Sequence, residues 1–185
     1  MQIIIRQQRL AFRGKFAISI NNQPAYSVYE QRLRWTPKTL IKTEGGEEIL
    51  MTLTQKFNWF WPRYIINRQE DFFVFHTHDL QRSKYRCVVG QDLYEIIAHK
   101  GFKHSLIKNL IQIGWWDIQV VKWPEKDYYI IEVDDDVDEL LVIALCVVVD
   151  EINNDKLHSV SLDVGNFPWG MPPFDENWRP KESGR

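Results

Sequence analysis

The segment Asp134–Asn153 reads DDDVDELLVIALCVVVDEIN, and it decides the fold of this chain. Acidic residues fill five of its first six positions, ten apolar residues run unbroken from Leu140 to Val149, and Asp150 and Glu151 follow. A helix that is apolar on every side belongs either in a membrane or in the middle of a protein core. The rest of the chain must therefore surround this segment if it is not a membrane span.

The length of the apolar run separates the alternatives. A membrane span needs roughly 20 apolar residues, so ten are too few. The β-branched residues leave a core strand as one interpretation. A helix over residues 136–153 is the other, because Asp136 as N-cap and Glu139 have the capping-box spacing and the acids suit the positive end of a helix dipole. Asp150 and Glu151 oppose that dipole at the other end. We predict the helix, since ten residues are long for a strand.

A pattern of basic, aromatic and apolar residues recurs three times in the first 66 residues, at spacings of 23 and 24 residues. Each copy reads as strand, short turn and strand, with Gly14, Pro37 and Pro62 near the middle. Turn-forming residues join the copies at 21–24 and 44–47. Similar strands are predicted further along, at 72–75, 85–89, 94–98, 111–113 and 116–121.

Short strands at such regular intervals are typical of a sandwich or barrel. About twelve of them followed by one apolar helix fit a closed antiparallel β-barrel, because closure removes the sheet edges and the helix fills the interior. A helix of about 17 residues is about 25 Å long, which matches a tilted strand of about seven or eight residues. We therefore predict a mainly β chain, with a barrel and central helix at 1–153 and a Pro/Trp-rich extension at 154–185.

The hairpin repeat, the sequence DELLVIAL at 138–145 and the closing Asp150 together resemble the tubby C-terminal-like superfamily. Within it, the chain is most similar to the LURP-one-related proteins and their bacterial relatives, and more distantly to phospholipid scramblases. The resemblance covers about residues 1–153 and implies a twelve-stranded barrel around a hydrophobic helix. Tubby proteins bind phosphoinositides through basic residues on the barrel surface. That basic pair does not map residue by residue onto this chain, so the resemblance implies lipid binding only as a hypothesis. Most relatives end soon after the helix, whereas 32 residues follow Asn153 in this chain.

Positive charge is concentrated in the first part of the chain, since residues 1–66 carry a net charge of +6 and residues 134–185 one of −8. Either the basic part attracts anions such as lipid headgroups, or the two parts neutralise each other in the folded protein. Like charges opposite each other destabilise a sheet, so a basic row needs acidic neighbours or an anionic ligand unless it forms a solvated outer face. Trp35, Trp59 and Trp61 lie nearby in the sequence and suit a lipid interface. Equivalent repeat positions, which can line up across a sheet, hold the candidate anion- or lipid-binding residues Arg9, Lys15, Arg32, Lys38, Lys56 and Arg63.

Few residues indicate chemistry. His76 and His78 share a strand face as metal ligands can, but no second cluster accompanies them, and a polar strand end is the interpretation that we favour. The nucleotide-binding, hydrolase and metalloprotease motifs are absent from the sequence. We therefore expect a non-enzymatic protein with no cofactor, no metal site and no catalytic residue. With only Cys87 and Cys146, no signal peptide pattern and no transmembrane segment, a cytoplasmic setting is expected.

Two functions follow as hypotheses. The first is a binding module for phosphoinositide or other anionic lipid headgroups at a membrane surface. The alternative is a protein-interaction or regulatory domain that acts through its tail. The aromatic residues of the tail could instead pack on the chain's own barrel. Within the tail, residues 160–164 are predicted to form a further strand, and residues 181–185 are expected to be disordered. Nucleic acid is not an expected partner, because the net charge is −2. The aromatic tail residues are Phe167, Trp169, Phe174 and Trp178.

Overall fold

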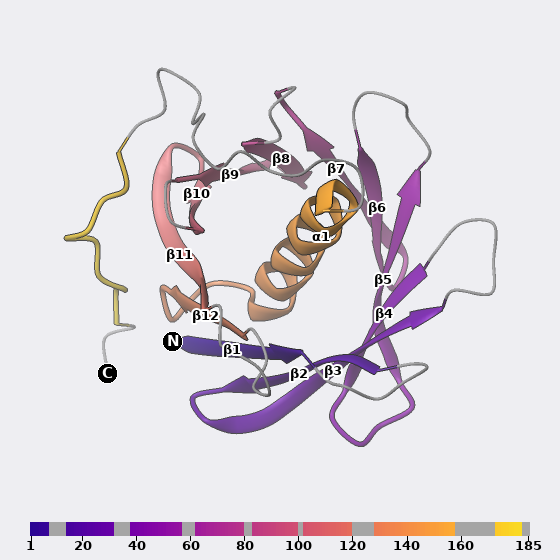
Figure 1. Cartoon of the computed structure of the whole chain (residues 1–185). Helices are drawn as coiled ribbons and strands as arrows, with labels where there is room; N and C mark the ends of the chain where they lie inside the picture. The colour runs from indigo at the N-terminus through magenta and orange to yellow at the C-terminus, as the bar shows by residue number, and fades with distance from the viewer. Residues whose placement is uncertain are drawn as a thin grey trace.

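The computed structural model describes residues 1–7, 14–31, 38–56, 62–79, 83–99, 102–119, 128–157 and 173–182. These residues form a closed antiparallel β-barrel with one helix inside it (Figure 1). Each strand pairs with its neighbours in sequence, and β1 closes the barrel by pairing with β12. The predicted fold class is therefore confirmed.

The barrel is made of twelve strands within the described ranges. In chain order they are β1 (Gln2–Gln7), β2 (Gly14–Ile20), β3 (Gln23–Gln31), β4 (Lys38–Thr43), β5 (Ile49–Lys56), β6 (Arg63–Arg68), β7 (Asp71–Thr77), β8 (Lys84–Val89), β9 (Asp92–Ala98), β10 (Lys103–Lys108), β11 (Ile111–Gln119) and β12 (Tyr128–Val133).

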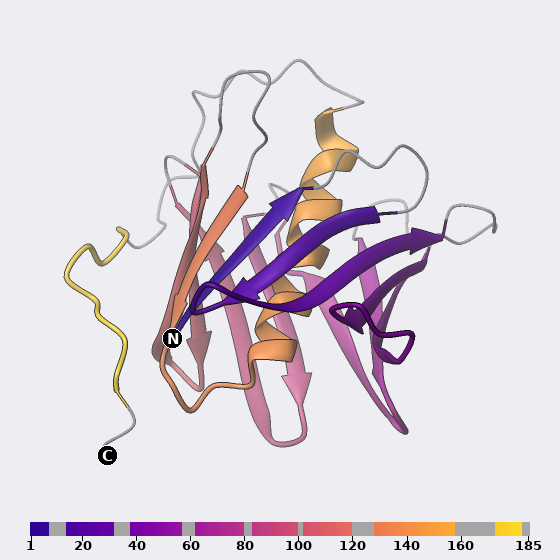
Figure 2. The same ribbon diagram turned by 90° about the horizontal axis from the view of Figure 1, so that it is seen from below.

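The helix α1 (Glu139–Leu157) runs through the barrel (Figure 2). Every side chain from Leu140 to Val149 is buried, which is why this stretch can be apolar all round. The predicted limits 136–153 are wrong at both ends. Asp138, not Asp136, is the N-cap, because its carboxylate accepts a hydrogen bond from the backbone N–H of Leu141 at 3.1 Å. The residues between the end of β12 and Asp138 form the turn that brings the chain into the barrel.

The barrel has two different ends. At the end where α1 begins, here called the hairpin end, tight turns join β2 to β3, β4 to β5, β6 to β7, β8 to β9 and β10 to β11. The β2–β3 turn has positive φ at both Asn21 and Asn22, which is the conformation of a two-residue hairpin turn. At the other end, here called the loop end, α1 leaves the barrel (Figure 2).

The strand β11 differs from its prediction, because the segments 111–113 and 116–121 form one strand that bends at a bulge instead of two strands. A Cβ at Gly114 would come within 2.5 Å of Val133 Cγ1 and 2.9 Å of the carbonyl oxygen of Glu132. Glycine therefore lets β12 approach β11 closely at this point, and it does not mark a strand boundary.

Polar groups of the barrel anchor both ends of the helix. Arg68 forms an ion pair with Asp138, and Tyr26 Oη donates to Glu139 Oε1 at 3.2 Å. Near the other end, Tyr129 donates to Asp150 and Thr39 donates to Glu151. These hydroxyl donors explain how two acids are tolerated where the helix dipole disfavours them.

Candidate functional site

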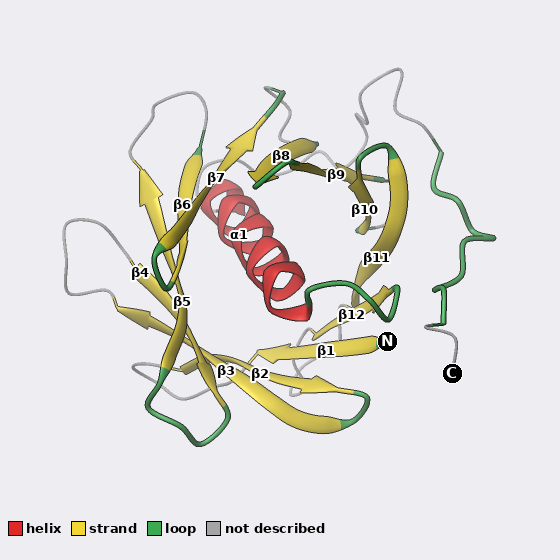
Figure 3. Cartoon of the chain, turned by 180° about the vertical axis from the view of Figure 1, so that it is seen from behind, coloured by secondary structure: helices red, strands yellow, loops and turns green. Residues whose placement is uncertain are grey.

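A cross-strand row of charged residues and one histidine, here called the charged row, lies on the outer wall formed by β5, β6, β7, β8 and β9, which lie in order around the barrel (Figure 3). Strand register places each member opposite the next, in the order Lys56, Arg63, His76, Arg86 and Glu95. Sequence neighbours of the row point inward and are buried in the core, so the row itself faces outward. The buried neighbours are Tyr64, Phe75, Tyr85 and Tyr94.

Three cations at one end of this row form the cationic patch, defined as Lys38, Lys56 and Arg63. Lys38 is opposite Thr54, and Lys56 lies two residues further along β5, so Lys38 and Lys56 are diagonal neighbours on one face. Lys56 and Arg63 are exposed, and Lys38 is half-buried. Among the residues that the structure describes, no carboxylate forms an ion pair with any of the three. The patch is thus a concentration of positive charge without an internal counterion in that part of the chain.

The other end of the row is neutralised. Glu95 is buried and accepts from Arg86 Nε at 2.8 Å, and Lys84 Nζ lies 3.1 Å from the same oxygen. Burial alone would raise the pKa of Glu95, but the hydrogen bonds and charges of Arg86 and Lys84 outweigh it and hold that pKa below its ordinary value. This carboxylate is therefore ionised and pairs with Arg86 and Lys84. It forms no ion pair with the cationic patch.

His76 lies between the two ends. Its partial burial and the positive charge of Arg63 lower the pKa of its imidazole below the ordinary value. His76 is therefore neutral near pH 7, and the influence of Arg63 shows that the two side chains are electrostatically coupled. In the sequence, His76 is a candidate metal ligand or part of a polar strand end, and the alternation of polar His76 with apolar Phe75 is the signal that could have placed it on the outer face.

The structure describes only some of the residues that the sequence marks as candidates for anion or lipid binding. Lys38, Lys56 and Arg63 come together, whereas Arg9 and Arg32 lie outside the described residues, as do Trp35, Trp59 and Trp61. Lys15 belongs to β2, but its side chain is outside the described part. The expectation that equivalent repeat positions share one row is wrong for Lys38 and Arg63: Lys38 lies level with Ile65, two residues along β6 from Arg63. Tilted, staggered strands of a closed barrel produce such an offset.

Neither metal ligands nor a reactive thiol are assembled in the described ranges. No group of three or more His, Cys, Asp or Glu there has the arrangement to hold a metal ion. His78 follows the end of β7 and is exposed. Burial raises the pKa of Cys87 to about 12 and raises that of Cys146 as well, so both thiols stay protonated and unreactive at neutral pH.

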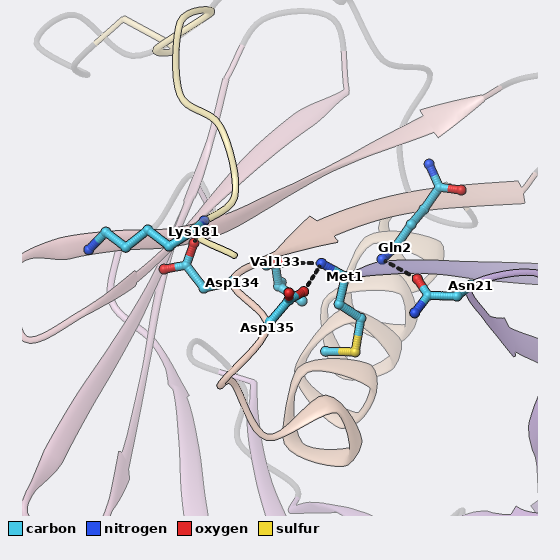
Figure 4. A network of polar contacts seen from close by, with 7 residues as sticks. All are labelled: Met1, Gln2, Asn21, Val133, Asp134, Asp135 and Lys181. Carbon is cyan, nitrogen blue, oxygen red and sulfur yellow. Dashed lines mark hydrogen bonds and ion pairs between the residues drawn. The ribbon is translucent and has the colours of Figure 1, made fainter. Parts of the chain in front are cut away.

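A cavity of about 650 Å³ at the hairpin end is lined by more acidic than basic side chains, in contrast to the cationic patch. Most of its acids already have partners, since Asp92 pairs with Lys108 Nζ at 2.9 Å and Asp134 Oδ1 accepts from the backbone N–H of Lys181 at 2.7 Å. Nearby, the Met1 amino group donates to Asp135 at 2.6 Å (Figure 4). Because five carboxylates and two lysines line it, this mouth is less favourable for an anionic ligand than the cationic patch. The carboxylates are those of Asp92, Asp134, Asp136, Asp138 and Glu182.

The described part of the tail lies against the outside of the barrel, beside β11 (Figure 1). The ring of Phe174 packs edge-on against Trp115 and His99, with centroids 5.6 and 5.4 Å apart. Trp178 Nε1 donates to the carbonyl of Gln112 at 3.1 Å. The expected disorder from residue 181 onward is wrong for Lys181, whose backbone bonds to Asp134 and Asp135. Residues 160–164, Phe167 and Trp169 are outside the described residues.

Comparison with known proteins gives one family. The sequence profile described as LURP-one-related matches residues 1–150, which is most of the chain and the whole barrel up to the middle of α1. No curated protein and no solved structure matches. Within the described residues, no helix has both the length and the apolar content needed to cross a membrane.

Proposed function

The chain belongs to the LURP-one-related family of tubby-like barrels, and from that premise we propose that it is a non-enzymatic binding module for an anionic ligand, a phosphoinositide or another acidic lipid headgroup. The cationic patch of Lys38, Lys56 and Arg63 is the observation that carries the proposal. Phosphate groups accept charge-assisted hydrogen bonds from both Lys and Arg, and Arg can bind two phosphate oxygens at once.

The geometry of Lys56 and Arg63 favours a ligand over a purely structural role. The two residues are directly opposite on adjacent strands, and like charges in that relation destabilise a sheet. No described carboxylate forms an ion pair with Lys56 or Arg63, whereas Glu95 pairs with Arg86 further along the same row. A phosphate bound between Lys56 and Arg63 would remove the repulsion and gain two ionic hydrogen bonds.

A tail-mediated protein interaction is the second candidate, and the contacts argue against it for the described segment. Phe174 and Trp178, the aromatic residues that would engage a partner, already pack on Trp115 and on the backbone of Gln112. Binding a partner through them would first require breaking these intramolecular contacts. We therefore keep the outer wall as the proposed site.

We also propose a cytoplasmic location. Its support is the pair of free thiols of Cys87 and Cys146, both buried and not joined in a disulfide, which is usual for proteins of reducing compartments. An anionic cytoplasmic leaflet would supply the acidic headgroups that the cationic patch suits.

Co-sedimentation with vesicles tests the proposed function. We expect partitioning onto phosphatidylcholine vesicles that contain an anionic lipid, and little onto pure phosphatidylcholine. The double variant Lys56→Gln/Arg63→Gln should lose about 2 kcal/mol, at about 1 kcal/mol for each cation near an anionic surface, which is about a 30-fold weaker partition. Its folding should be unimpaired, because the substitution removes a repulsive pair from an exposed surface.

The matched control removes the same formal charge elsewhere. Arg6 on β1 and Arg179 in the tail are both exposed, so Arg6→Gln/Arg179→Gln should partition almost as the unsubstituted protein does. Equal partition onto neutral and anionic vesicles would reject the proposed function. An equal loss in both double variants would show that net charge, not the patch, drives binding.

A further inference from the structure

An apolar row runs beside the charged row on the same outer wall. Register places Ile65 opposite Val74, Val74 opposite Val88 and Val88 opposite Leu93. Each of Ile65, Val74 and Val88 lies two residues along its strand from Arg63, His76 or Arg86, toward the hairpin end. The two rows are thus separated by about 6.6 Å, at about 3.3 Å for each strand residue.

Large apolar side chains on this wall are exposed to solvent. Val88 is 55% exposed, and Phe72, two residues beyond Val74 on β7, is 67% exposed. Phe72 and Val88 are diagonal neighbours because Val74 faces Val88 directly. Two exposed apolar side chains side by side on a strand face carry a cost in water and an aggregation hazard. Together with the half-buried Val74, they indicate a surface that meets an apolar partner.

The combination of cations and exposed apolar side chains on one wall suits a membrane interface. When the wall lies flat on a bilayer, the cations meet lipid phosphates and the apolar side chains beside them reach toward the acyl chains, as in other surface-bound amphipathic elements. A soluble phosphate compound would use the cations and leave Phe72 and Val88 in water.

We propose that the β5–β8 part of the outer wall docks on an anionic bilayer, with the cationic patch on lipid phosphates and Phe72 and Val88 inserted at the interface. The inference rests on the proposed function and names the bilayer itself as the partner. Acidic groups fix how the barrel meets the membrane: Glu70 and Asp71 at the β6–β7 turn and the carboxylates of the cavity hold the hairpin end away from anionic lipid. The barrel therefore docks on its side and not on its end.

Removal of the two exposed apolar groups is the first test. Phe72→Thr/Val88→Thr introduces β-branched residues suited to strands and leaves the cationic patch intact. Because both side chains are exposed, the barrel should remain folded. We expect at least about a tenfold weaker partition onto vesicles of phosphatidylcholine and phosphatidylserine, from the lost apolar burial.

Phe102 provides the matched control. It is 53% exposed but lies between β9 and β10 at the loop end, away from the wall. Its φ of +68° suits asparagine, so Phe102→Asn should fold, and it should bind the same vesicles as the unsubstituted protein does.

A fluorescent probe on the wall is the second test. Cys87 and Cys146 are buried, so an environment-sensitive maleimide probe can be directed to Val88→Cys in the native protein. We expect its emission to shift to the blue on adding anionic vesicles. The same probe on Gln23→Cys, an exposed residue at the start of β3, should not shift.

The outcomes separate the inference from the function on which it rests. If Phe72→Thr/Val88→Thr binds anionic vesicles as tightly as the unsubstituted protein while Lys56→Gln/Arg63→Gln does not, the apolar row is not inserted and the inference is wrong, although headgroup binding stands. If neither the unsubstituted protein nor any variant distinguishes anionic from neutral vesicles, the proposed function fails and the inference fails with it. A blue shift of the Val88 probe that grows with protein concentration in the absence of lipid would assign the wall to self-association and overturn the bilayer assignment.

Discussion

The buried imidazole of His104 makes the stability of the barrel dependent on pH. His104 lies on β10, is only 4% exposed, and stacks on Trp116 with ring centroids 5.1 Å apart and 13° between the planes. Its Nδ1 has no hydrogen-bond partner among the described residues. Burial, with a smaller contribution from the charge of His99, lowers the pKa of His104 to about 4, against an opposing hydrogen bond to the backbone of Phe102.

The direction of the effect follows from the two pKa values. The unfolded chain binds a proton at this position below a pH of about 6.5, whereas the folded protein does so only near its pKa of about 4. Stability is therefore fully present above the unfolded pKa and is lost as the pH falls from about 6.5 toward 4. Linkage gives a loss from this residue of about 2 kcal/mol between pH 7.5 and pH 5.

Urea unfolding at pH 7.5 and pH 5 measures this loss, with His104→Phe as the variant that keeps a stacked ring and cannot titrate. The unfolding free energy of the unsubstituted protein should fall by about 2 kcal/mol more than that of the variant. His78→Gln, a change at an exposed histidine, should follow the unsubstituted protein. If His104→Phe loses as much stability on acidification, the imidazole is not the group responsible. His104→Gln serves the same comparison should the larger ring fail to fit.

Two further predictions concern the helix and the wall. Leu141 is 2% exposed inside the barrel, so Leu141→Ala should lower the free energy of unfolding by about 2–5 kcal/mol in a thermal melt. Leu141→Asp should prevent folding, because an unpaired buried charge costs several kcal/mol. A folded, soluble aspartate variant detected by circular dichroism would contradict the central position of α1. His76 has a lowered pKa beside Arg63, so an anionic surface that favours its protonated form should bind more tightly at pH 5.5 than at pH 7.5. His76→Gln should reduce that gain in a vesicle partition assay, and an unchanged gain would remove His76 from the site.

The barrel and its central helix are predictable because a single constraint determines both. Ten apolar residues from Leu140 to Val149 are too few for a membrane and have no polar face for solvent, so many short strands must enclose them. The residue at which the helix begins is less predictable. Asp134, Asp135, Asp136 and Asp138 are chemically similar candidates for the N-cap. The choice depends on how many residues the turn from β12 needs, which is a property of the closed barrel.

The site is predictable only in its residue types. The repeat marks Lys56 in one set of equivalent basic positions and Lys38 and Arg63 in another, and strand register brings these three onto one face. It does not give the stagger between strands, which places Lys56 opposite Arg63 and Lys38 opposite Thr54. The exposed apolar side chains are missed for the same reason, since Phe72 and Val88 belong to strands whose pairing becomes known only when the barrel closes.

The closed fold limits where this protein can bind a ligand. Helix α1 occupies the interior, so the lumen is filled by buried side chains from Leu140 to Val149. On the side of β9 to β12, the chain covers part of its own outer surface with Phe174 and Trp178. At the hairpin end, carboxylates line the cavity. The β5–β8 part of the outer wall differs from all three, because its patch at Lys56 and Arg63 lies beside exposed apolar side chains. A charged row and an apolar row side by side serve neither core packing nor helix anchoring, and the proposed contact with an anionic bilayer would give both a use.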